Sequence, residues 1–366
     1  MQNIAFVIGD SHTNTLGLIR SLGEESINFI LILVDNTDSA NVLKCRYLKK
    51  NKYYWVSSYT EVFSILMDNI HLNSEKTIIC SNDHAAEFID AHEEQLVKYY
   101  RTPLKGKHIG DLFMKDKQCF LAQECGLVVP KSVIYKRGES IDSLILTYPV
   151  LTKPLESING SKKDIHICKS KEELSYAMSK SGFCDSFIIQ EFIDKEYELN
   201  LLGVRTDSGI TWGGCIQKYR HNPLITGPSA YAKLDSVEAH GIDTKAVECL
   251  LDKIDYYGPF SVEFLHKGDQ NFFMEVNLRN DGLCYVATSA GLNLPAIYIQ
   301  NICKKSTPIK PTVMMNLRLD FKLMLKGHIK PFVWLKQLFQ TDCWIDYNKN
   351  DKLPFLYTMM KVVTKK

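Results

Sequence analysis

Residues 258–281 place carboxylates, an amide and a guanidinium where they could bind a metal ion and phosphates. Two runs of aromatic and β-branched residues, 260–265 and 272–277, flank a Lys-Gly-Asp turn, which predicts a β-hairpin. Side chains alternate faces along a strand, so Glu275, Asn277 and Arg279 are expected on one face. Such a polar face is not a core.

The two strands of this hairpin are expected to bring a second carboxylate to the same place. An even register sets Glu263 beside Glu275, while Phe272, Met274 and Val276 form the opposite face. Clustered oxygen ligands suit Mg²⁺ or Mn²⁺ held together with substrate phosphates, and not zinc. The alternative is that this face is the solvated side of an edge hairpin.

Length and charge limit the kinds of partner. A chain of 366 residues is long enough for two or three domains. Charged residues make up 23% and the net charge is +2, so we expect no nucleic acid or membrane partner, and instead small molecules.

Cysteine usage and hydropathy indicate the compartment. The eleven cysteines show no Cys-x-x-Cys pair and are interpreted as thiols in a reducing environment. The apolar runs have the length of strands, and no signal peptide or membrane span is recognised. We expect a soluble, cytoplasmic protein.

The first third of the chain has the pattern of a parallel α/β domain. An apolar run at 4–8 is followed by a polar turn, a helical pattern and a buried strand at 27–34, which predicts a parallel sheet with its first loop at the carboxyl edge. That loop, GDSHTN, lacks the glycine fingerprint of a dinucleotide site. Asp83 could cap a helix or make a contact at the same edge.

A second pattern begins at residue 111. A helix is expected from about 114 to 125, and Lys153 ends an apolar strand in an extended conformation because Pro154 follows it. The loop 157–163 holds a glycine and two lysines. It could be a flap that covers phosphates, or an ordinary hairpin turn.

Further strands and a loop are expected before the hairpin. Alternation from residue 194 places Glu196, Glu198 and Asn200 on one face of a strand. Residues 220–235 contain two prolines and a glycine and are predicted to be a loop. With Lys218 at its root, that loop could clamp an acidic substrate or be a surface excursion.

Three amphipathic segments end the chain. Residues 317–325, 332–339 and 355–363 are predicted to be helices that form an appendage packed on the main body. They could equally cover a partner surface.

In order along the chain, these elements resemble the ATP-grasp superfamily over about 111–304. Within it, the chain looks most like carboxylate-amine ligases, similar to D-aspartate ligase and carbamoyl phosphate synthetase. The matching motifs are Asp116-Lys117, Thr152-Lys153-Pro154, the Gly160 flap, Gln190 to Ile193 with Glu196, Glu263, and Glu275 with Asn277 and Arg279.

The resemblance implies an α/β fold with defined parts. It implies a parallel, Rossmann-like domain at 1–110 that precedes the ATP-grasp domain. A two-lobed ATP-grasp domain would follow at 111–305, with its small lobe at about 127–190, and a helical extension would occupy 306–366.

The resemblance also implies roles for individual residues. ATP phosphates would be held by Lys117, which we favour over Lys115, by Lys153, and by a flap that includes Ser157, Asn159 and Gly160. Adenine would meet the hinge at Glu191, Phe192 and Ile193, and Glu196 would accept from the ribose hydroxyls. Glu263, Glu275 and Asn277 would hold Mg²⁺, and Arg279 with Lys153 would act on the transferred phosphate.

The implied reaction is ATP-dependent ligation. A small carboxylate would attack the γ-phosphate to give an acyl phosphate, which an amine would convert to an amide, leaving ADP and phosphate. The alternatives are a thiol acceptor, a carboxylate kinase, or an ATP-binding module without chemistry. Members of the superfamily are often homodimers.

Overall fold

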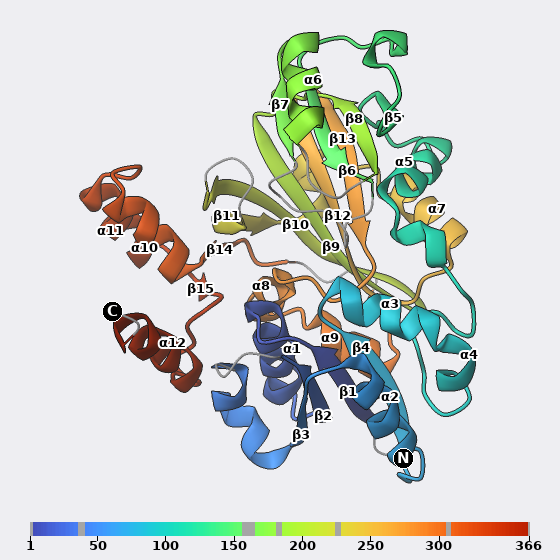
Figure 1. Ribbon diagram of the computed structural model, residues 1–366. Coiled ribbons are helices and arrows are strands. Elements are labelled where there is room, and N and C mark those ends of the chain that lie inside the picture. Colours follow the sequence, from blue (N-terminus) through green and yellow to red (C-terminus); the bar gives the residue numbers. More distant parts are fainter. Residues whose placement is uncertain are drawn as a thin grey trace.

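The structure is a computed structural model that describes residues 3–35, 41–155, 165–180, 185–223, 228–304 and 309–364. Over these ranges the chain builds three sheets (Figure 1). None of the helices in them is long and apolar enough to cross a bilayer. The ten cysteines in the same ranges are all free thiols.

The N-terminal sheet is parallel and is covered on both faces. Its strands are β1 (Asn3–Gly9), β2 (Asn28–Val34), β3 (Lys52–Val56) and β4 (Glu75–Cys80), in the order β3-β2-β1-β4. Its helices are α1 (Thr13–Glu24), α2 (Tyr59–Asp68), α3 (Asp83–Ala91) and α4 (Glu93–Leu96). Alternate residues of β1 enter two different cores, as expected for a parallel strand buried on both sides. The parallel sheet predicted from the sequence is confirmed.

A second, seven-stranded sheet forms the centre of the molecule. Its strands are β9 (Tyr197–Thr206), β10 (Gly209–His221), β11 (Ser229–Asp235), β12 (Gly258–Lys267), β13 (Gln270–Asn277), β14 (Thr312–Met315) and β15 (Cys343–Trp344). The order is β13-β12-β9-β10-β11-β14-β15. Helices α5 (Lys115–Glu124) and α7 (Thr244–Ile254) lie on one face, and α8 (Cys284–Ser289) and α9 (Leu294–Gln300) pack between the other face and α1.

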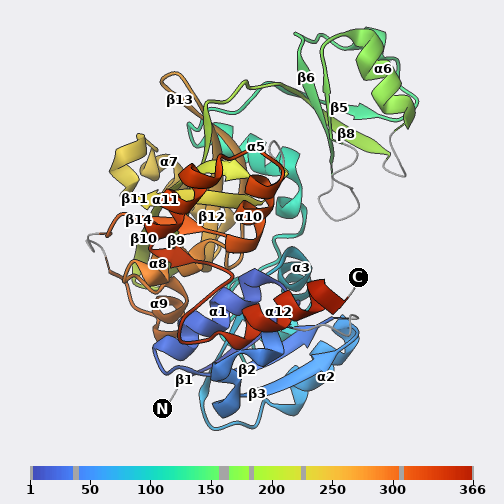
Figure 2. The same ribbon diagram turned by 90° about the vertical axis from the view of Figure 1, so that its left-hand side faces the viewer.

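The third sheet stands out from the rest of the molecule (Figure 2). Its strands β5 (Ser132–Lys136), β6 (Val150–Pro154), β7 (His166–Cys168) and β8 (Ser186–Glu191) are antiparallel in the order β5-β8-β6-β7. Helix α6 (Lys171–Lys180) packs on it and closes a separate small core. This arrangement agrees with the small lobe expected near 127–190, although those limits stay a prediction.

The predicted hairpin is present, but one of its faces differs from the prediction. Glu263 pairs directly with Glu275, which confirms the expected register. The pairing then shifts, so that Phe264 lies opposite Phe273 and Met274 is the extra residue of a β-bulge. The bulge interrupts the alternation, and Phe273 is buried where Phe272 and Met274 were expected.

The predicted loop at 220–235 is mostly strand. β10 continues to His221, and β11 begins at Ser229. Pro223 and Pro228 belong to the connection between these long strands. After it, Ala230, Ala232 and Leu234 alternate into the interior, a strand pattern that the turn residues obscure in the sequence.

The C-terminal segment combines helices with sheet. Helices α10 (Leu317–Leu325), α11 (Pro331–Phe339) and α12 (Leu353–Thr364) confirm the three predicted segments closely. The predicted helical extension also contributes two short strands to the central sheet, because β14 pairs with β11 and β15 pairs with β14. Four residues of strand are too short to show a clear alternation.

A buried ion pair attaches this segment to the N-terminal domain. Arg20 on α1 lies 2.9 Å from the Asp351 carboxylate, and both side chains are almost fully buried. The same guanidinium donates to the carbonyls of Ile345 and Asp351, and the backbone N–H of Arg46 donates to Asp351. Both charges are therefore satisfied without water.

We expect Arg20→Met to lower the free energy of unfolding by about 3–5 kcal/mol, because it leaves the Asp351 carboxylate buried without a cation. Urea denaturation measures the change. Removal of the exposed pair between Lys253 and Glu124 by Glu124→Gln is the control, with an expected cost below about 1 kcal/mol. Equal costs for the two variants would contradict this account.

Candidate active site

A cavity of about 730 Å³ lies between the N-terminal sheet, the central sheet and the C-terminal helices. The carboxyl ends of the neighbouring strands β1 and β4 open into it, as is usual for ligand sites on parallel sheets. Its lining includes Asp10, His12, Asn14, Asp83, Asn200, Lys218, Ser229, Glu263, Arg279, Asp281, Arg318, Tyr357 and Lys361.

The carboxylates of the hairpin lie on the face that borders this cavity. Glu263 lines the cavity and faces Glu275 across the β12–β13 ladder. Burial, together with the nearby Glu275, raises the pKa of Glu263. The pair is therefore a site of crowded negative charge that favours binding of a cation.

A buried lysine supplies part of that compensation. Lys218 Nζ lies 3.0 Å from the Glu263 carboxylate and 3.3 Å from that of Glu198. Burial alone would lower the pKa of Lys218, but the two carboxylates outweigh it and raise the pKa. Lys218 is thus held as a cation between two carboxylates. It is not free to clamp an acidic substrate, which was one of the two alternatives raised from the sequence.

A second cationic group lies on the side of the small sheet. Lys115 Nζ is 3.6 Å from the Glu275 carboxylate, and Lys153 Nζ donates to the side-chain oxygen of Gln190 at 3.1 Å. Burial, with the nearby Lys115, lowers the pKa of Lys153 to about 8. Burial and the neighbouring Lys115 disfavour the protonated form of Lys153, and an anion bound beside it would stabilise that form.

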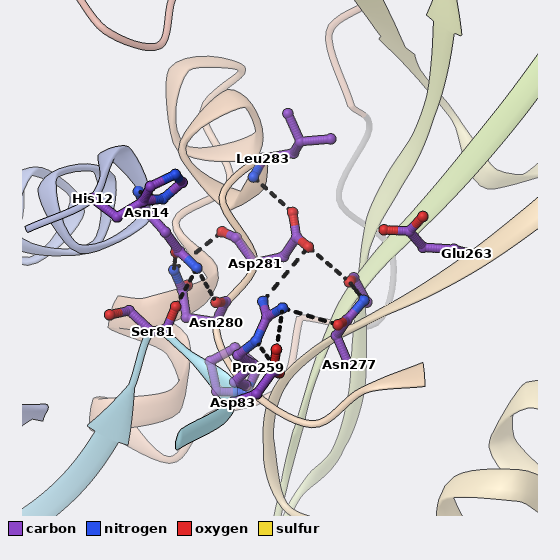
Figure 3. Close-up of polar contacts among 12 residues, drawn as sticks. His12, Asn14, Ser81, Asp83, Pro259, Glu263, Asn277, Asn280, Asp281 and Leu283 are labelled. Carbon is purple, nitrogen blue, oxygen red and sulfur yellow. Dashed lines mark hydrogen bonds and ion pairs between the residues drawn. The ribbon is translucent and has the colours of Figure 1, made fainter. Parts of the chain in front are cut away.

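Arg279 joins the hairpin to the N-terminal domain (Figure 3). Its guanidinium lies 2.6 Å from Asp83 and 3.9 Å from Asp281, and donates to the side-chain oxygen of Asn277 at 3.0 Å. Asn82, not Asp83, caps α3. The contact at the sheet edge is therefore the correct alternative for Asp83.

The same edge is locked by paired amides. Asn14 and Asn280 exchange hydrogen bonds of 2.9 Å, and the Asn14 amide also donates to the Ser81 carbonyl. Asp281 accepts from the Ser261 hydroxyl at 3.0 Å and from the backbone N–H of Leu283 at 2.7 Å. The segment after β13 is thereby fixed against the loops of β1 and β4.

Several polar atoms at the cavity have no hydrogen-bond partner within the described residues. They include Asn200 Oδ1 and Ser229 Oγ, whose side chains are 1% and 9% exposed, and Asp10 Oδ1. Asn200 pairs with Glu263 across β9 and β12. Buried polar atoms are normally satisfied, so these atoms are best explained as ligand contacts.

The donor set fits a magnesium ion that shares its coordination with phosphates. Within the described ranges, no three His, Cys, Asp or Glu side chains are grouped as a complete metal site. Mg²⁺ bound with a nucleotide needs only one or two carboxylates, which Glu263 and Glu275 provide. The partnerless oxygen of Asn200 lies beside Glu263. The third predicted ligand, Asn277, already accepts from Arg279.

The structure distinguishes the two lysines near the start of α5, Lys115 and Lys117. Lys117 is exposed, whereas Lys115 is partly buried next to Glu275. Helix α5 begins at Lys115. The side chain of Lys117, two residues later, therefore points about 200° around the helix axis from that of Lys115. We therefore propose Lys115, in place of Lys117, as the lysine that meets the phosphates.

The predicted hinge contacts are partly occupied by the protein itself. The N–H groups of Glu191 and Phe192 donate to the carbonyls of Lys131 and Pro149, and the Ile193 carbonyl accepts from Lys195. Glu196 is exposed, and its carboxylate accepts from the Gly268 N–H at 3.0 Å, where it stabilises the hairpin turn. Ser157, Asn159 and Gly160 lie outside the described residues.

Three site residues were missed or left without a role at the sequence level. Alternation along β9 had already placed Asn200 on the polar face with Glu198. Asp10 and Asn14 come from the GDSHTN loop, whose position at a strand end was the available signal. Their contact with the segment after β13 depends on packing between domains.

Comparisons with known proteins agree with this geometry. Residues 120–286 match the family model of the ATP-grasp domain. Formate-dependent phosphoribosylglycinamide formyltransferase from Nitratiruptor sp. is 28% identical over 180 residues, which cover 45% of this chain and 43% of the relative. N5-carboxyaminoimidazole ribonucleotide synthase from Aquifex aeolicus is 31% identical over 142 residues, with 38% and 37% covered. The chain thus matches about two fifths of these relatives.

A solved structure extends the likeness of the fold beyond this segment. N5-carboxyaminoimidazole ribonucleotide synthetase from Thermus thermophilus superimposes with a TM-score of 0.68 at 15% sequence identity, covering 85% of this chain and 83% of the other. The match at 120–286 identifies an ATP-grasp domain within the chain, and the N-terminal parallel sheet and the antiparallel sheets share the fold of this solved structure.

Proposed function

We propose that this chain is an ATP-dependent ligase that phosphorylates a small carboxylate and joins it to an amine. The direct pairing of Glu263 with Glu275, between the cations of the small-lobe side and the large cavity, carries the proposal. A cation bound by this pair would lie at the boundary between the proposed nucleotide region and the proposed substrate region.

The nucleotide is expected between the small sheet and the hairpin. Lys153 and Lys115 supply positive charge there, and burial, together with the nearby Lys115, lowers the pKa of Lys153 to about 8. ATP phosphates would balance this positive charge. Bound Mg²⁺, held by Glu263 and Glu275, would neutralise charge on the phosphates during transfer.

The carboxylate and the amine are expected in the cavity. Arg279 lies at its edge, oriented by Asp83 and Asn277, and could stabilise negative charge on the transferred phosphate. Arg318 and Lys361 add positive charge from the C-terminal helices. Asp10 offers an acceptor atom that could bind an N–H group of an amine.

The relatives support the reaction class. The name of the Nitratiruptor relative specifies formate, which is a carboxylate, as the compound on which it depends. The match to the ATP-grasp domain, at 120–286, includes the hairpin. A carboxylate needs activation before an amine can attack it, and acyl phosphate formation supplies the leaving group.

The first test is ADP release from Mg-ATP with pools of small carboxylates, each with and without a pool of amines. ADP that requires both pools supports the ligase. ADP formed with carboxylates alone would indicate a kinase or an uncoupled acyl phosphate. Nucleotide binding without ADP release in any pool would count against catalysis.

Glu275→Gln is expected to reduce this turnover by about 10²–10³-fold, because it removes one of the two charges that hold the metal. The fold should persist, since Glu275 is partly exposed. The exposed Glu94 on α4 gives the control, Glu94→Gln. Unchanged turnover in Glu275→Gln would rule out the metal assignment.

ATP affinity is expected to fall as pH rises above about 8. Lys153 is protonated below its pKa of about 8 and loses its charge above it, so the dissociation constant should rise by up to about tenfold per pH unit. Calorimetry with a non-hydrolysable ATP analogue measures this. Lys153→Arg keeps its charge and should remove the dependence; a pH dependence that persists in it would exclude Lys153 as the cause.

The choice between the two helix lysines is tested by a matched pair of substitutions. We expect Lys115→Ala to weaken binding of the same analogue by about tenfold or more. A hydrogen bond to a charged group typically contributes about 1.5–3 kcal/mol, and about 1.4 kcal/mol corresponds to a tenfold change in affinity. Lys117→Ala should change it little, because Lys117 is exposed. The opposite ranking would restore the assignment to Lys117.

A further inference from the structure

The exposed sides of α10, α11 and α12, which we call the C-terminal face, are unusually apolar. The three helices lie on one side of the molecule, toward the viewer in Figure 2. Large exposed apolar side chains there are Phe321, Leu325, Phe332, Val333, Leu335, Phe339, Leu353, Leu356 and Met360. Exposed apolar residues gathered in this way mark an interaction surface.

Helix α11 is the most exposed part of the C-terminal face. None of its residues is buried, and Phe332 and Phe339 are 79% and 81% exposed. The helix is held mainly through Trp334, whose ring lies 5.4 Å from that of Phe321, over a small core that includes Leu323. A helix built to remain in water would not present two phenylalanines.

The same segment is strongly basic at its surface. Residues 317–364 contain eight lysines and arginines, of which Arg318 and Lys361 line the cavity. The other six are exposed: Lys322, Lys326, Lys330, Lys336, Lys349 and Lys352. Of its four aspartates, Asp320, Asp346 and Asp351 are buried, and Asp342 is exposed. The whole-chain charge of +2 therefore conceals a local excess of positive charge.

We propose that the C-terminal face docks on an anionic lipid membrane. Lysines around exposed Phe and Leu side chains match an interface of anionic headgroups above acyl chains. A second copy of this chain would place the same lysines against one another, which is unfavourable. Nucleic acid interfaces are more polar and would leave Phe332 and Phe339 without a partner.

Docking would bring the cavity close to the lipid surface. Helix α12 lines the cavity with Tyr357, Thr358 and Lys361, while Leu356 and Met360 are exposed on another side of the same helix. One short helix thus belongs to both the cavity and the C-terminal face. The expectation of no membrane partner was drawn from the net charge of the whole chain, which does not show where apolar and basic side chains gather on the surface.

The test is flotation of the full chain with vesicles of phosphatidylcholine and phosphatidylglycerol at a ratio of about 2:1, compared with pure phosphatidylcholine. We expect binding to the anionic vesicles that weakens with salt. The double substitution Phe332→Ser and Phe339→Ser should reduce it by at least about tenfold. Lys330→Ala with Lys336→Ala should reduce it by about tenfold at low salt.

Matched controls separate docking from general stickiness or misfolding. Ile145 and Tyr176, which are 99% and 67% exposed on the small-lobe side, are both changed to Ser and should leave flotation unchanged. Thermal melting should be unaltered in every variant. Absence of flotation with anionic vesicles overturns the proposal. So does a dimer in light scattering that Phe332→Ser and Phe339→Ser dissociate in a chain that does not float, or binding to single-stranded DNA without flotation.

Discussion

Glu263 and Glu275 are held opposite each other on neighbouring strands, and the arrangement around them follows from that repulsion. The Cβ atoms of residues opposed in this way lie about 5 Å apart, and two unit charges at that separation would repel by roughly 3 kcal/mol at an effective dielectric constant of about 20. The protein offsets part of this with Lys218 on one side and Lys115 on the other. Those lysines come from β10 and α5, so the charge balance links the sheet to the helix that packs on it.

The protein does not fully compensate the charged and polar groups around Glu263 and Glu275, and the uncompensated groups lie on two sides of this pair. On the small-lobe side, Lys153 is buried next to Lys115 and has a lowered pKa. On the cavity side, the Asn200 side-chain oxygen has no hydrogen-bond partner among the residues that the structure describes. A bound metal and polyphosphate would satisfy both sides together. The site therefore has the electrostatic character expected of a protein that binds a highly charged ligand between two lobes.

The sequence predicted the elements well because most of them show strong local patterns. The parallel start, the hairpin register and the three C-terminal helices follow from alternation, turn residues and helical periodicity. The bulge at Met274 and the pairing of β14 with β11 were not predictable. A single inserted residue and a four-residue strand leave little trace in a local pattern.

The site was predictable only where its residues belong to one element. Glu263 and Glu275 lie in one hairpin, and alternation placed them together. The start of the helix was predicted to within one residue, but which of Lys115 and Lys117 lies beside Glu275 depends on how that helix packs against the hairpin. The contacts of Arg279 with Asp83, and of Asn14 with Asn280, join distant segments and arise from packing.

The pairing of β14 with β11 has a consequence for how the protein assembles as it is synthesised. Until residues 312–315 emerge, β11 is an unprotected sheet edge with free backbone donors and acceptors. The cavity also lacks the wall that α10 and α12 supply. A growing chain would thus pass through a long interval with an edge able to recruit other strands, and chaperone protection would matter most in that interval.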